Sequence, residues 1–341
     1  MIKKYVMIFI VVLAVSAGAG WVFFGCAFEE EISHDPAPCE EEDYIVIGLS
    51  QIGSESDWRN ANTESFKSVF TAGNGYYLLY EDAQQKQENQ LKAVRDFILQ
   101  EVDYIILDPI VETGWDTVLM EAADAGIPVI LVDRQILLEN DELYTCWVGS
   151  NFREEGRAAG RWLEDYLKLQ SRENKEIRIV TLQGTPESSA QIGRTSGFAD
   201  VLSEHDNWNM LDKRNGEFTQ AKGQEVMRDF LKLYEDIDVV VSENDNMTFG
   251  AIEAIEAAGK TCGPGGDMII LSFDAVRAAI QFMQAGKINA VFECNPLLGP
   301  KVAEIIERLE AGEQVEKIQY IEETYFDTSM DLEKILKERV Y

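Results

Sequence analysis

From Tyr44 onward, the chain alternates short apolar runs with amphipathic segments, and this alternation narrows the possible folds more than any other feature of the sequence. Continuous runs of Val, Ile and Leu predict strands that are buried on both faces, as in parallel sheets. The strands predicted in this way are 45–50, 76–80, 103–107, 128–132, 177–182, 238–242, 268–272 and 289–293. The predicted helices between them include 86–99, 114–125, 153–168, 221–234, 247–258 and 275–285. This β-α succession predicts a doubly wound α/β architecture.

The chain of 341 residues is long enough for two domains, at roughly 100–200 residues each. Two of its stretches also resemble each other, because residues 101–134 and 236–274 both run strand, polar turn, helix, Ala-Gly helix end, strand and aspartate. Glycine supplies the left-handed cap that ends each helix, so Asp133 and Asp274 stand at equivalent strand ends. Two similar α/β lobes are the simplest explanation, and coincidence between generic β-α units is the alternative.

An apolar segment opens the chain. Two lysines precede an uncharged stretch, so residues 1–25 are predicted to be an export signal peptide or a membrane anchor. Cys26 suggests bacterial lipidation, but Phe23 stands where a lipobox usually has a small aliphatic residue, so a lipid anchor and a helical anchor both remain open. Residues 26–43 are acidic, contain two prolines and are predicted to form a disordered tether. The folded part then begins near Tyr44, in the periplasm or tethered outside the cell membrane.

The charge balance excludes one class of partner. With 61 Asp and Glu against 30 Lys and Arg, the formal net charge is -31, and such a surface repels the phosphate backbone of nucleic acid. The sequence has two histidines and five cysteines but no Cys-x-x-Cys pair, so no metal site, cofactor or histidine-based triad is expected. Export would permit disulfides, but the cysteine spacing leaves their pairing open.

Polar residues gather at the predicted strand ends, which is where ligands bind in open α/β sheets. They are Ser50, Asp108, Asp133, Arg134, Gln183, Gly184, Glu243, Asn244, Asp245, Asp274, Glu293 and Asn295. Each alone could be an ordinary helix cap or turn residue, but together they favour a binding site. Carboxylates accept hydrogen bonds from pairs of hydroxyl groups, and Asn and Arg supply donors. This combination suits a sugar.

An aromatic residue in an unusual place supports the same interpretation. Trp58 stands beside Arg59 in a polar stretch, GSESDWRNANT, which follows the first strand and reads as a loop. A large indole is a poor loop filler, but its face can cover the C–H surface of a sugar. We therefore expect Trp58 to be an exposed cleft wall rather than a core residue.

Enzymatic chemistry finds little support. No Gly-x-Gly-x-x-Gly follows the first strand, no P-loop is present, and GSESD is not a nucleophile elbow. Asp133 and Asp274 could in principle form a glycosidase pair, but they would come from opposite lobes. Arg134 also favours the ionised form of its neighbour Asp133 over the acid that hydrolysis needs. We expect a protein that is not an enzyme, and a carbohydrate-active enzyme is the weaker alternative.

A series of motifs along the chain resembles a known family. The motifs are IGLSQIGSESDWR, EDAQQKQENQLKAVRDFI, DPIVETGW, VILVDR, LQGTPESSAQIGRTSGF, GEFTQAKGQEVM, ENDNMTFGAIEAI, LSFDA and VFECNPLLGP. From residue 44 to about residue 330, the chain resembles the periplasmic sugar-binding proteins of ABC transporters, of the ribose-binding type. It looks most like their galactofuranose-binding branch. The motifs are specific for the family and less specific for the sugar.

The resemblance implies the type I periplasmic binding protein fold, in which two Rossmann-like lobes with parallel sheets are joined by a three-strand hinge and close on one sugar. The implied lobes are residues 44–148 with 296–325 and residues 149–295 with 326–341. The implied ligand-binding residues are Ser50, Trp58, Arg59, Asp108, Asp133, Arg134, Arg194, Phe218, Asn244, Asp274 and Glu293.

Several of these residues have implied roles or alternatives. Trp58 would be the stacking platform and Arg59 its polar partner. The alternative for Phe218 is a core aromatic, and the alternative for Arg194 is a solvated helix charge. Asp108 departs from the family pattern, which tends to have a small residue there, and a carboxylate near the cleft could alter the preference for hydroxyl groups. Trp147, in the stretch TCWVGS at residues 145–150 close to the implied hinge, has no assigned role.

The implied function is capture of a monosaccharide, either galactofuranose-like or an aldohexose or pentose, by a monomeric extracytoplasmic protein that feeds an ABC permease. The alternative is a sensory protein that presents its closed form to a signalling receptor such as a sensor kinase. The two would differ in their partner surfaces, for which the sequence has no motif.

Overall fold

The computed structural model describes residues 43–341 of the chain. The predicted signal peptide or anchor at residues 1–25, the predicted lipidation site Cys26 and the tether up to residue 42 lie outside the described residues. Within residues 43–341, no helix is both long enough and apolar enough to cross a membrane.

The first lobe is built on a parallel sheet of six strands in the order β11-β5-β4-β3-β1-β2. Its strands are β1 (Ile45–Gln51), β2 (Tyr76–Asp82), β3 (Tyr104–Leu107), β4 (Val129–Val132), β5 (Cys146–Gly149) and β11 (Ile318–Tyr320). Its helices are α1 (Asp57–Val69), α2 (Gln87–Leu99), α3 (Asp116–Asp124) and α9 (Gly299–Glu310), with short 3-10 turns η1 (Ala72–Asn74) and η2 (Asp141–Leu143). The strand β1 is an interior strand, since Ile47 lies opposite Leu78 on one side and Tyr104 on the other.

The second lobe repeats this plan in a sheet with the order β12-β10-β9-β8-β6-β7, in which only the pairing of β10 with β12 is antiparallel. Its strands are β6 (Ile177–Gln183), β7 (Trp208–Asn215), β8 (Val239–Ser242), β9 (Ile269–Asp274), β10 (Ala290–Glu293) and β12 (Tyr325–Asp327). Its helices are α4 (Phe152–Leu169), α5 (Ser189–Leu202), α6 (Gln220–Leu233), α7 (Asp245–Ala257), α8 (Arg277–Gln284) and α10 (Leu332–Glu338).

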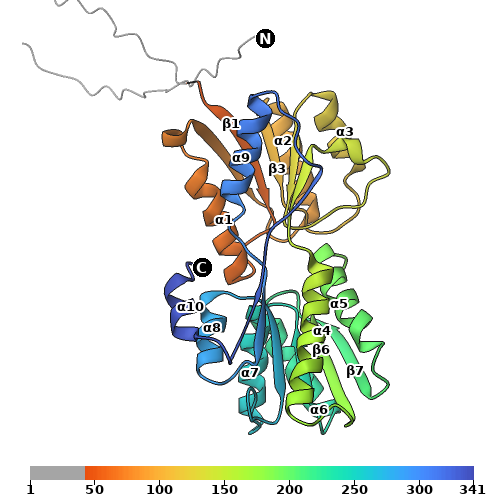
Figure 1. Cartoon of the computed structure of the whole chain (residues 1–341). Coiled ribbons are helices and arrows are strands. Elements are labelled where there is room, and N and C mark those ends of the chain that lie inside the picture. Colours follow the sequence, from red (N-terminus) through yellow and green to blue (C-terminus); the bar gives the residue numbers. More distant parts are fainter. Residues whose placement is uncertain (1–42) are drawn as a thin grey trace, which may run out of the picture. The chain divides into compact units, whose positions relative to one another are not determined.

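The two sheets have the same strand order, with β6 in the place of β1, β8 in that of β3 and β9 in that of β4. The two similar stretches of sequence fall on matching units, β3-α3-β4 and β8-α7-β9. Figure 1 shows each sheet covered by helices. The prediction of two similar α/β lobes is therefore confirmed.

The chain passes between the two lobes three times. It crosses from β5 to α4 at residues 150–151, from β10 to α9 at residues 294–298, and from β11 to β12 at residues 321–324. Tyr325 pairs with Phe292 in the second sheet, so the expected lobe boundary after residue 325 falls inside β12. We refer to these three segments as the first, second and third crossings.

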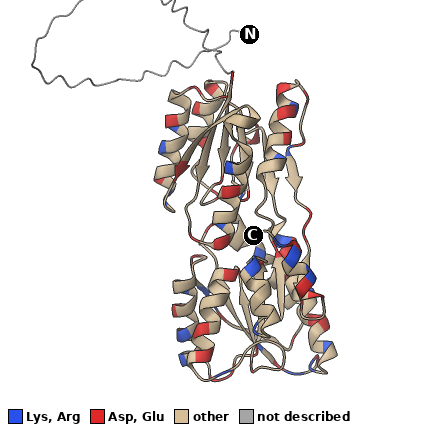
Figure 2. Ribbon diagram, turned by 90° about the vertical axis from the view of Figure 1, so that its left-hand side faces the viewer, with Lys and Arg blue, Asp and Glu red and all other residues tan. Residues whose placement is uncertain are grey.

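Apolar side chains cover both faces of each sheet, as the continuous apolar runs predicted. On β3, Ile106 packs into one buried cluster, while its neighbours Ile105 and Leu107 pack into another. Each such buried side chain contributes about 1.5–3 kcal/mol relative to exposure. Charged residues lie mostly on the helices and loops (Figure 2).

Elements with a mixed polar pattern escaped the sequence analysis. The strand β7 lies at the edge of its sheet and is partly exposed, so its sequence WNMLDKRN has no apolar run. The expectation of a loop around Trp58 was wrong, because Trp58 and Arg59 lie in the first turn of α1. Ser56 caps this helix, since its hydroxyl accepts a hydrogen bond from the Arg59 amide at 3.1 Å.

Candidate binding site

A cavity lies beyond the carboxyl ends of strands from both sheets, with walls contributed by both lobes. It encloses about 290 Å³ of space between protein atoms, part of it open to solvent. Its lining residues are Glu55, Ser56, Trp58, Arg59, Asp133, Arg134, Phe152, Ala190, Arg194, Phe218, Asn244, Asp274 and Cys294. Three arginines, three carboxylates and three aromatic rings therefore face one small space.

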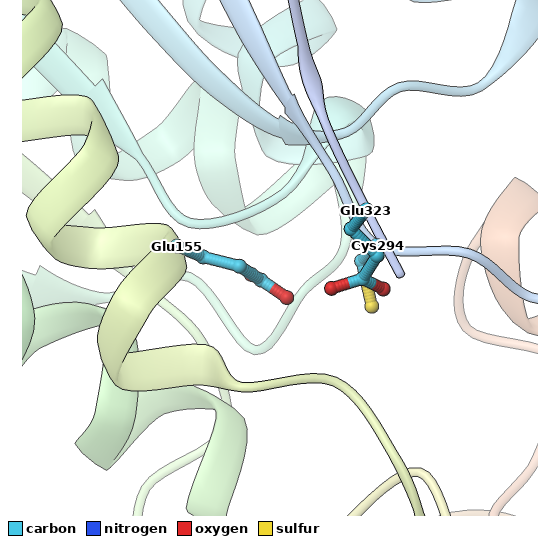
Figure 3. A group of neighbouring side chains, drawn as sticks. All are labelled: Glu155, Cys294 and Glu323. Carbon is cyan, nitrogen blue, oxygen red and sulfur yellow. The ribbon is translucent and has the colours of Figure 1, made fainter. Parts of the chain in front are cut away.

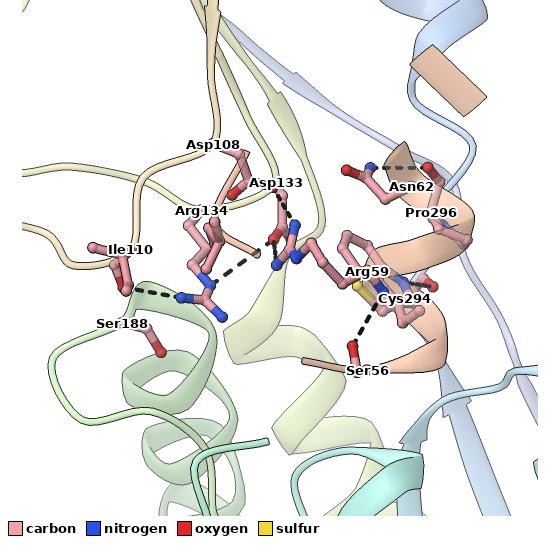
Figure 4. Close-up of polar contacts among 12 residues, drawn as sticks. Ser56, Arg59, Asn62, Asp108, Ile110, Asp133, Arg134, Ser188, Cys294 and Pro296 are labelled. Carbon is pink, nitrogen blue, oxygen red and sulfur yellow. Dashed lines mark hydrogen bonds and ion pairs between the residues drawn. The ribbon is translucent and has the colours of Figure 1, made fainter. Parts of the chain in front are cut away.

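Arg59 is the centre of the first lobe's half of the cavity. Its Nε donates to Glu55 at 3.0 Å, its Nη2 donates to Asp133 at 2.8 Å, and its Nη1 pairs with Asp108 (Figure 4). Burial alone would lower the pKa of Arg59, but the three carboxylates outweigh burial and raise that pKa above its ordinary value. The planar guanidinium is therefore charged and held in one orientation.

Arg134 lies near Arg59 and is less completely paired. Its Nη1 donates to the Ile110 carbonyl at 2.9 Å, and its Nε lies 3.9 Å from Asp133 Oδ2, which is an ion-pair distance. This buried Nε has no hydrogen-bond partner within residues 43–341. Burial and the neighbouring Arg59 charge lower the pKa of Arg134. The Oε2 atom of Glu55 is also buried without a hydrogen-bond partner in the described chain. Buried polar groups are nearly always hydrogen-bonded in native proteins, so these two atoms indicate where a polar ligand belongs.

Arg194, on α5, has the matching position in the second lobe. Its Nε donates to Glu155 at 2.6 Å, its Nη2 donates to Asp274 at 3.1 Å, and its Nη1 donates to the Glu243 carbonyl. Glu155 and Asp274 raise the pKa of Arg194 against the opposing effect of burial. Arg194 is only 3% exposed, so the alternative of a solvated helix charge was wrong.

Each arginine also lies over an aromatic ring. The distances from guanidinium carbon to ring centroid are 4.7 Å for Arg59 and Trp58, 5.3 Å for Arg134 and Phe218, and 5.4 Å for Arg194 and Phe152. Cation–π contacts of this kind are stronger in desolvated sites. The rings therefore help to hold the arginines in place while presenting apolar surface to the cavity.

Trp58 joins the two lobes. Its ring belongs to the same buried apolar cluster as Phe152 and Phe218 of the second lobe, and its indole Nε1 donates to the Cys294 carbonyl in the second crossing at 2.6 Å. It lines the cavity but is only 4% exposed. The expectation of an exposed wall was therefore wrong for this closed arrangement, because the second lobe covers the ring.

Hydrogen bonds also join the lobes beside the cavity. The backbone amide of Asp57 donates to Asn246 Oδ1 at 3.0 Å, and the amide of Gln135 donates to Ser189 Oγ at 2.8 Å. Both bonds run from the first lobe to the second. The structure is therefore a closed state of the two lobes.

Three cavity residues have a backbone conformation that L-amino acids rarely adopt. The φ angles are 57° for Asp133, 57° for Phe218 and 100° for Asp274. Non-glycine residues with such angles are uncommon and cluster at functional sites, where the surrounding fold holds them. Asp133 and Asp274 share this feature at equivalent strand ends, which is a second sign that the lobes present equivalent groups to the cavity.

Neighbouring residues explain how two of these conformations are held. Trp147 is buried and its Nε1 donates to the Asp133 carbonyl at 3.2 Å, which provides the role that the sequence did not reveal. Gly184 leaves room for Phe218, since a Cβ at residue 184 would lie 1.8 Å from the Phe218 ring.

The structure separates the predicted site residues into two groups. Those that line the cavity are Trp58, Arg59, Asp133, Arg134, Arg194, Phe218, Asn244 and Asp274. The Asn244 side chain caps α7 and donates to the Phe218 carbonyl at 2.9 Å, so it shapes the wall. The other three predicted residues, Ser50, Asp108 and Glu293, do not line the cavity.

These three residues lie behind or beside the site. Ser50 and Asp108 are fully buried at adjacent strand ends, and Asp108 pairs with Arg59. Glu293 forms an ion pair with Arg339 at 2.6 Å, so its carboxylate serves the C-terminal segment. A strand-end position alone does not show which way a side chain points.

Five lining residues were missed by the sequence analysis: Glu55, Ser56, Phe152, Ala190 and Cys294. Cys294 stands directly between two residues that were selected, and Phe152 begins the first helix after a crossing. The repeated β-α unit gave no signal for Cys294 or Phe152, because both positions depend on where the chain crosses between the lobes.

The charges of the cavity indicate the kind of ligand. Each lining carboxylate already pairs with an arginine, an arrangement that suits a neutral polyhydroxyl ligand better than a cation.

Comparison with known proteins agrees with this geometry. Residues 47–314 match the periplasmic binding protein domain family. The chain is 39% identical over 297 residues to the galactofuranose-binding protein YtfQ of Escherichia coli, a match that covers 85% of this chain and 91% of that protein.

Solved structures give the same result. The periplasmic binding component of the arabinose ABC transporter from Shewanella sp. ANA-3, bound to α- and β-L-arabinofuranose, matches with a TM-score of 0.81 and 40% identity over 86% of this chain and 95% of that one. A Mycobacterium smegmatis protein in complex with β-D-fucofuranose matches with the same TM-score and identity, over 86% and 97% of the two chains. Because the family match spans most of the folded part, this chain belongs to the periplasmic binding protein family and is a substrate-binding protein rather than an enzyme.

Proposed function

We propose that this protein captures one monosaccharide in a furanose ring form and delivers it to an ABC permease. The observation that carries the proposal is the pair of buried polar atoms without a hydrogen-bond partner, Arg134 Nε and Glu55 Oε2, in a cavity walled by aromatic rings. The cavity is a small space of about 290 Å³, part of it open to solvent, between the two lobes. It therefore suits a single sugar ring better than an oligosaccharide.

The relatives support the choice of ring form. The named ligands of three similar proteins are galactofuranose, arabinofuranose and fucofuranose, and all three are five-membered rings. This chain has the carboxylates and arginines that such a ring with its hydroxyl-bearing side chain requires. We infer that its ligand belongs to this group.

Each wall of the cavity has a role in this proposal. Trp58 and Phe218 cover the C–H faces of the ring, and Arg134 Nε donates to a ring hydroxyl or to the ring oxygen. Glu55 and the two equivalent aspartates, Asp133 and Asp274, accept hydrogen bonds from hydroxyl pairs. Because the three arginines are already oriented by carboxylates and rings, little conformational entropy is lost when the sugar binds.

Asp108 acts indirectly in this proposal. It is buried behind the cavity and pairs with Arg59, so it influences hydroxyl preference by orienting Arg59 rather than by touching the sugar. Ser50 lies on the neighbouring strand end and Glu293 pairs elsewhere, so neither is assigned a ligand contact.

We also propose that the protein works as a monomer held at the outer face of the cell membrane by residues 1–25 or a lipid on Cys26. The cavity is complete within one chain, since both walls come from the same two lobes. The transporter component from Shewanella is among the most similar solved structures, which favours import over sensing.

The test is a panel of sugars measured by thermal shift and calorimetric titration on the folded protein. We expect L-arabinose, D-galactose and D-fucose to bind, with a ligand at 100-fold its Kd adding about 2.7 kcal/mol to stability. Carbon-13 spectra of a bound, labelled sugar would show a furanose anomeric carbon. Binding of the pyranose form alone would overturn the assignment of the ring.

A pair of arginine variants tests whether the cavity is the site. Arg134→Gln removes the donor that lacks a hydrogen-bond partner and should weaken binding at least tenfold, because a buried hydrogen bond to the ligand is lost. Arg95→Gln is the matched control, since Arg95 is exposed and pairs with Glu121 between α2 and α3. Equal affinity in both variants would place the sugar elsewhere.

A further inference from the structure

The three crossings meet in one cluster of acidic and thiol groups beside the cavity, and none of these groups was assigned a sugar contact above. Ser150 comes from the first crossing, Cys294 and Asn295 from the second, and Glu323 from the third. Glu155, in the first turns of α4, points its carboxylate at Cys294 and Glu323 (Figure 3). The ligand-type atoms of Glu155, Cys294 and Glu323 lie within 4.8 Å of one another. We call these three residues the hinge cluster.

Hydrogen bonds tie Glu323 to both other crossings. Its Oε1 accepts from the Ser150 hydroxyl at 2.5 Å and from the Asn295 amide at 2.8 Å. The Ser150 oxygen also lies 3.2 Å from the Cys294 sulfur. One carboxyl oxygen of Glu323 is therefore used by two donors, and its other oxygen remains for the partners across the cluster.

The charges of the hinge cluster are not balanced. Glu155 is 7% exposed, and Arg194 donates to its Oε2 at 2.6 Å. Its Oε1 is buried and accepts no hydrogen bond of good geometry within the described residues, although the Cys294 thiol lies beside it. Glu323 forms no ion pair in the part of the chain that the structure describes. A buried carboxyl group, Glu155, and a partly buried one, Glu323, thus share one cation.

The groups that face the hinge cluster from neighbouring elements do not supply the missing positive charge. Arg194, on α5, is also paired with Asp274 at the end of β9. Asp133, at the end of β4, adds a further negative charge that acts on both Glu155 and Cys294. An ionised Glu323 in this position would be an uncompensated, partly buried charge beside a second carboxyl group, which is costly.

We propose that the hinge cluster is a proton-binding site, in which Glu323 is a neutral carboxylic acid at physiological pH and shares its proton with the unpaired oxygen of Glu155. The proton neutralises the excess negative charge and links the third crossing to α4. Burial and the nearby Glu155 raise the pKa of Glu323 to about 9, and burial also raises the pKa of Glu155. Cys294 also lines the cavity, but no hinge-cluster residue is assigned a sugar contact, so the site exists whether or not the ligand is a sugar.

A divalent cation is the rival occupant, and the contacts disfavour it. Arg194 already lies against Glu155, and its positive charge would repel a metal ion there. The Ser150 hydroxyl and the Asn295 amide already donate to Glu323. A proton needs only one oxygen from each carboxyl group, and those two oxygens are the ones left without donors.

The proton site has a consequence for the cavity. Glu155 orients Arg194, which lines the cavity, so loss of the proton adds a negative charge directly behind that ion pair.

The proton site also makes stability depend on pH, because the folded protein holds this proton more tightly than the unfolded chain does. The stabilisation is fully present at low pH and is lost as the pH rises toward the raised pKa of Glu323.

The direct test is infrared spectroscopy of the sugar-free protein at pH 8, where exposed carboxyl groups are ionised. We expect a carbonyl band of a protonated carboxylic acid that is absent in Glu323→Gln and unchanged in Glu322→Gln, the exposed neighbour on the same segment. Glutamine keeps the acceptor oxygen and adds donors, so the variant should fold. If it does not fold, titration of the band in the wild-type protein from pH 7 to pH 10 replaces it.

Thermal unfolding supplies an independent readout. Wild type and Glu322→Gln should lose stability together between pH 7 and pH 10, and Glu323→Gln should lose clearly less. A missing infrared band, or a Glu323→Gln protein with the wild-type pH profile, would overturn the proposal. Destabilisation of the wild-type protein by EDTA would overturn it in favour of a metal ion.

Discussion

Arg59 and Arg194 show how single side chains are prepared for binding. Each guanidinium comes from a different lobe, lies over an aromatic ring and is held by an aspartate at an equivalent strand end. The aspartates themselves have left-handed backbone angles. Positive and negative groups are therefore oriented before any ligand arrives, and this preorganisation favours tight binding of a neutral, hydrogen-bonding molecule.

At this scale, Trp58→Ala should damage binding more than folding. The ring covers one wall of the cavity and stacks beside the Arg59 guanidinium, so we expect a loss of about 2 kcal/mol or more in binding, roughly thirtyfold in affinity. Since part of the ring lines the cavity instead of packing against protein, the stability cost should be below the about 3–5 kcal/mol of a full core position.

Calorimetric titration with sugar and urea unfolding of the empty protein measure the two effects. Trp162→Ala is the control, because Trp162 stacks on Tyr166 of α4 and does not line the cavity. Unchanged affinity in Trp58→Ala together with a strongly lowered unfolding midpoint would mean that the ring is a core residue only.

At the scale of elements, the carboxyl ends of the strands position the site, and the segments after them determine which side chains enter it. The strand β6 ends next to Gly184, and the residues after β7 carry Phe218 into the cavity. Similarly, β5 presents Trp147, whose indole holds the Asp133 carbonyl. Residues that touch no ligand thus control the shape of the wall.

Gly184→Ala should therefore weaken binding by displacing Phe218. A Cβ at residue 184 would lie 1.8 Å from the ring, so the ring must leave its place. We expect at least a tenfold loss of affinity by calorimetry. Gly73→Ala is a matched control, since a Cβ there meets nothing closer than 3.9 Å. Wild-type affinity in Gly184→Ala would show that Phe218 is not needed at the wall.

At the scale of the whole molecule, a chain of net charge -31 keeps several acidic groups buried. Burial raises the pKa of Glu243 and of Asp245 to about 7. Between their ordinary pKa and these raised values, the folded protein binds more protons than the unfolded chain does. The contribution of these two groups to the free energy of unfolding is therefore fully present at low pH and is lost as the pH rises toward 7.

The urea midpoint should accordingly be higher at pH 5 than at pH 8. Repulsion among surface charges also lowers stability as the pH rises, but salt screens this repulsion. The comparison is therefore made in about 0.5 M NaCl, where screening is strong. Glu243→Gln should reduce the pH dependence. A midpoint that rises from pH 5 to pH 8 would contradict the assignment of buried, proton-holding carboxyl groups.

The lobes should also be independent of the N-terminal residues. A chain that starts at Tyr44 contains every described element and every lining residue of the cavity, so it should fold and bind sugar with wild-type affinity. In the full chain, Cys26→Ala should abolish labelling by radioactive fatty acid in cells if the anchor is a lipid. Retained labelling would exclude Cys26 as the attachment site, and a truncated chain that cannot fold would show that the boundary is wrong.

The sequence by itself determined the β-α alternation, the similarity of two lobes and the strand ends where ligand groups stand. These features depend on residues within one or two elements, where periodicity and glycine caps act locally. It placed Trp58 in a loop because the polar first turn of α1 hides a helix whose start is set by the Ser56 cap.

Only the tertiary structure decided which strand-end side chains face the cavity, which carboxylate holds which arginine, and how the crossings meet in the hinge cluster. Arg59 and Asp108 are 49 positions apart, and Trp58 and Cys294 are 236 apart. Such contacts form where three crossings and two sheets converge, and their energies depend on burial and on neighbouring charges that no local pattern records.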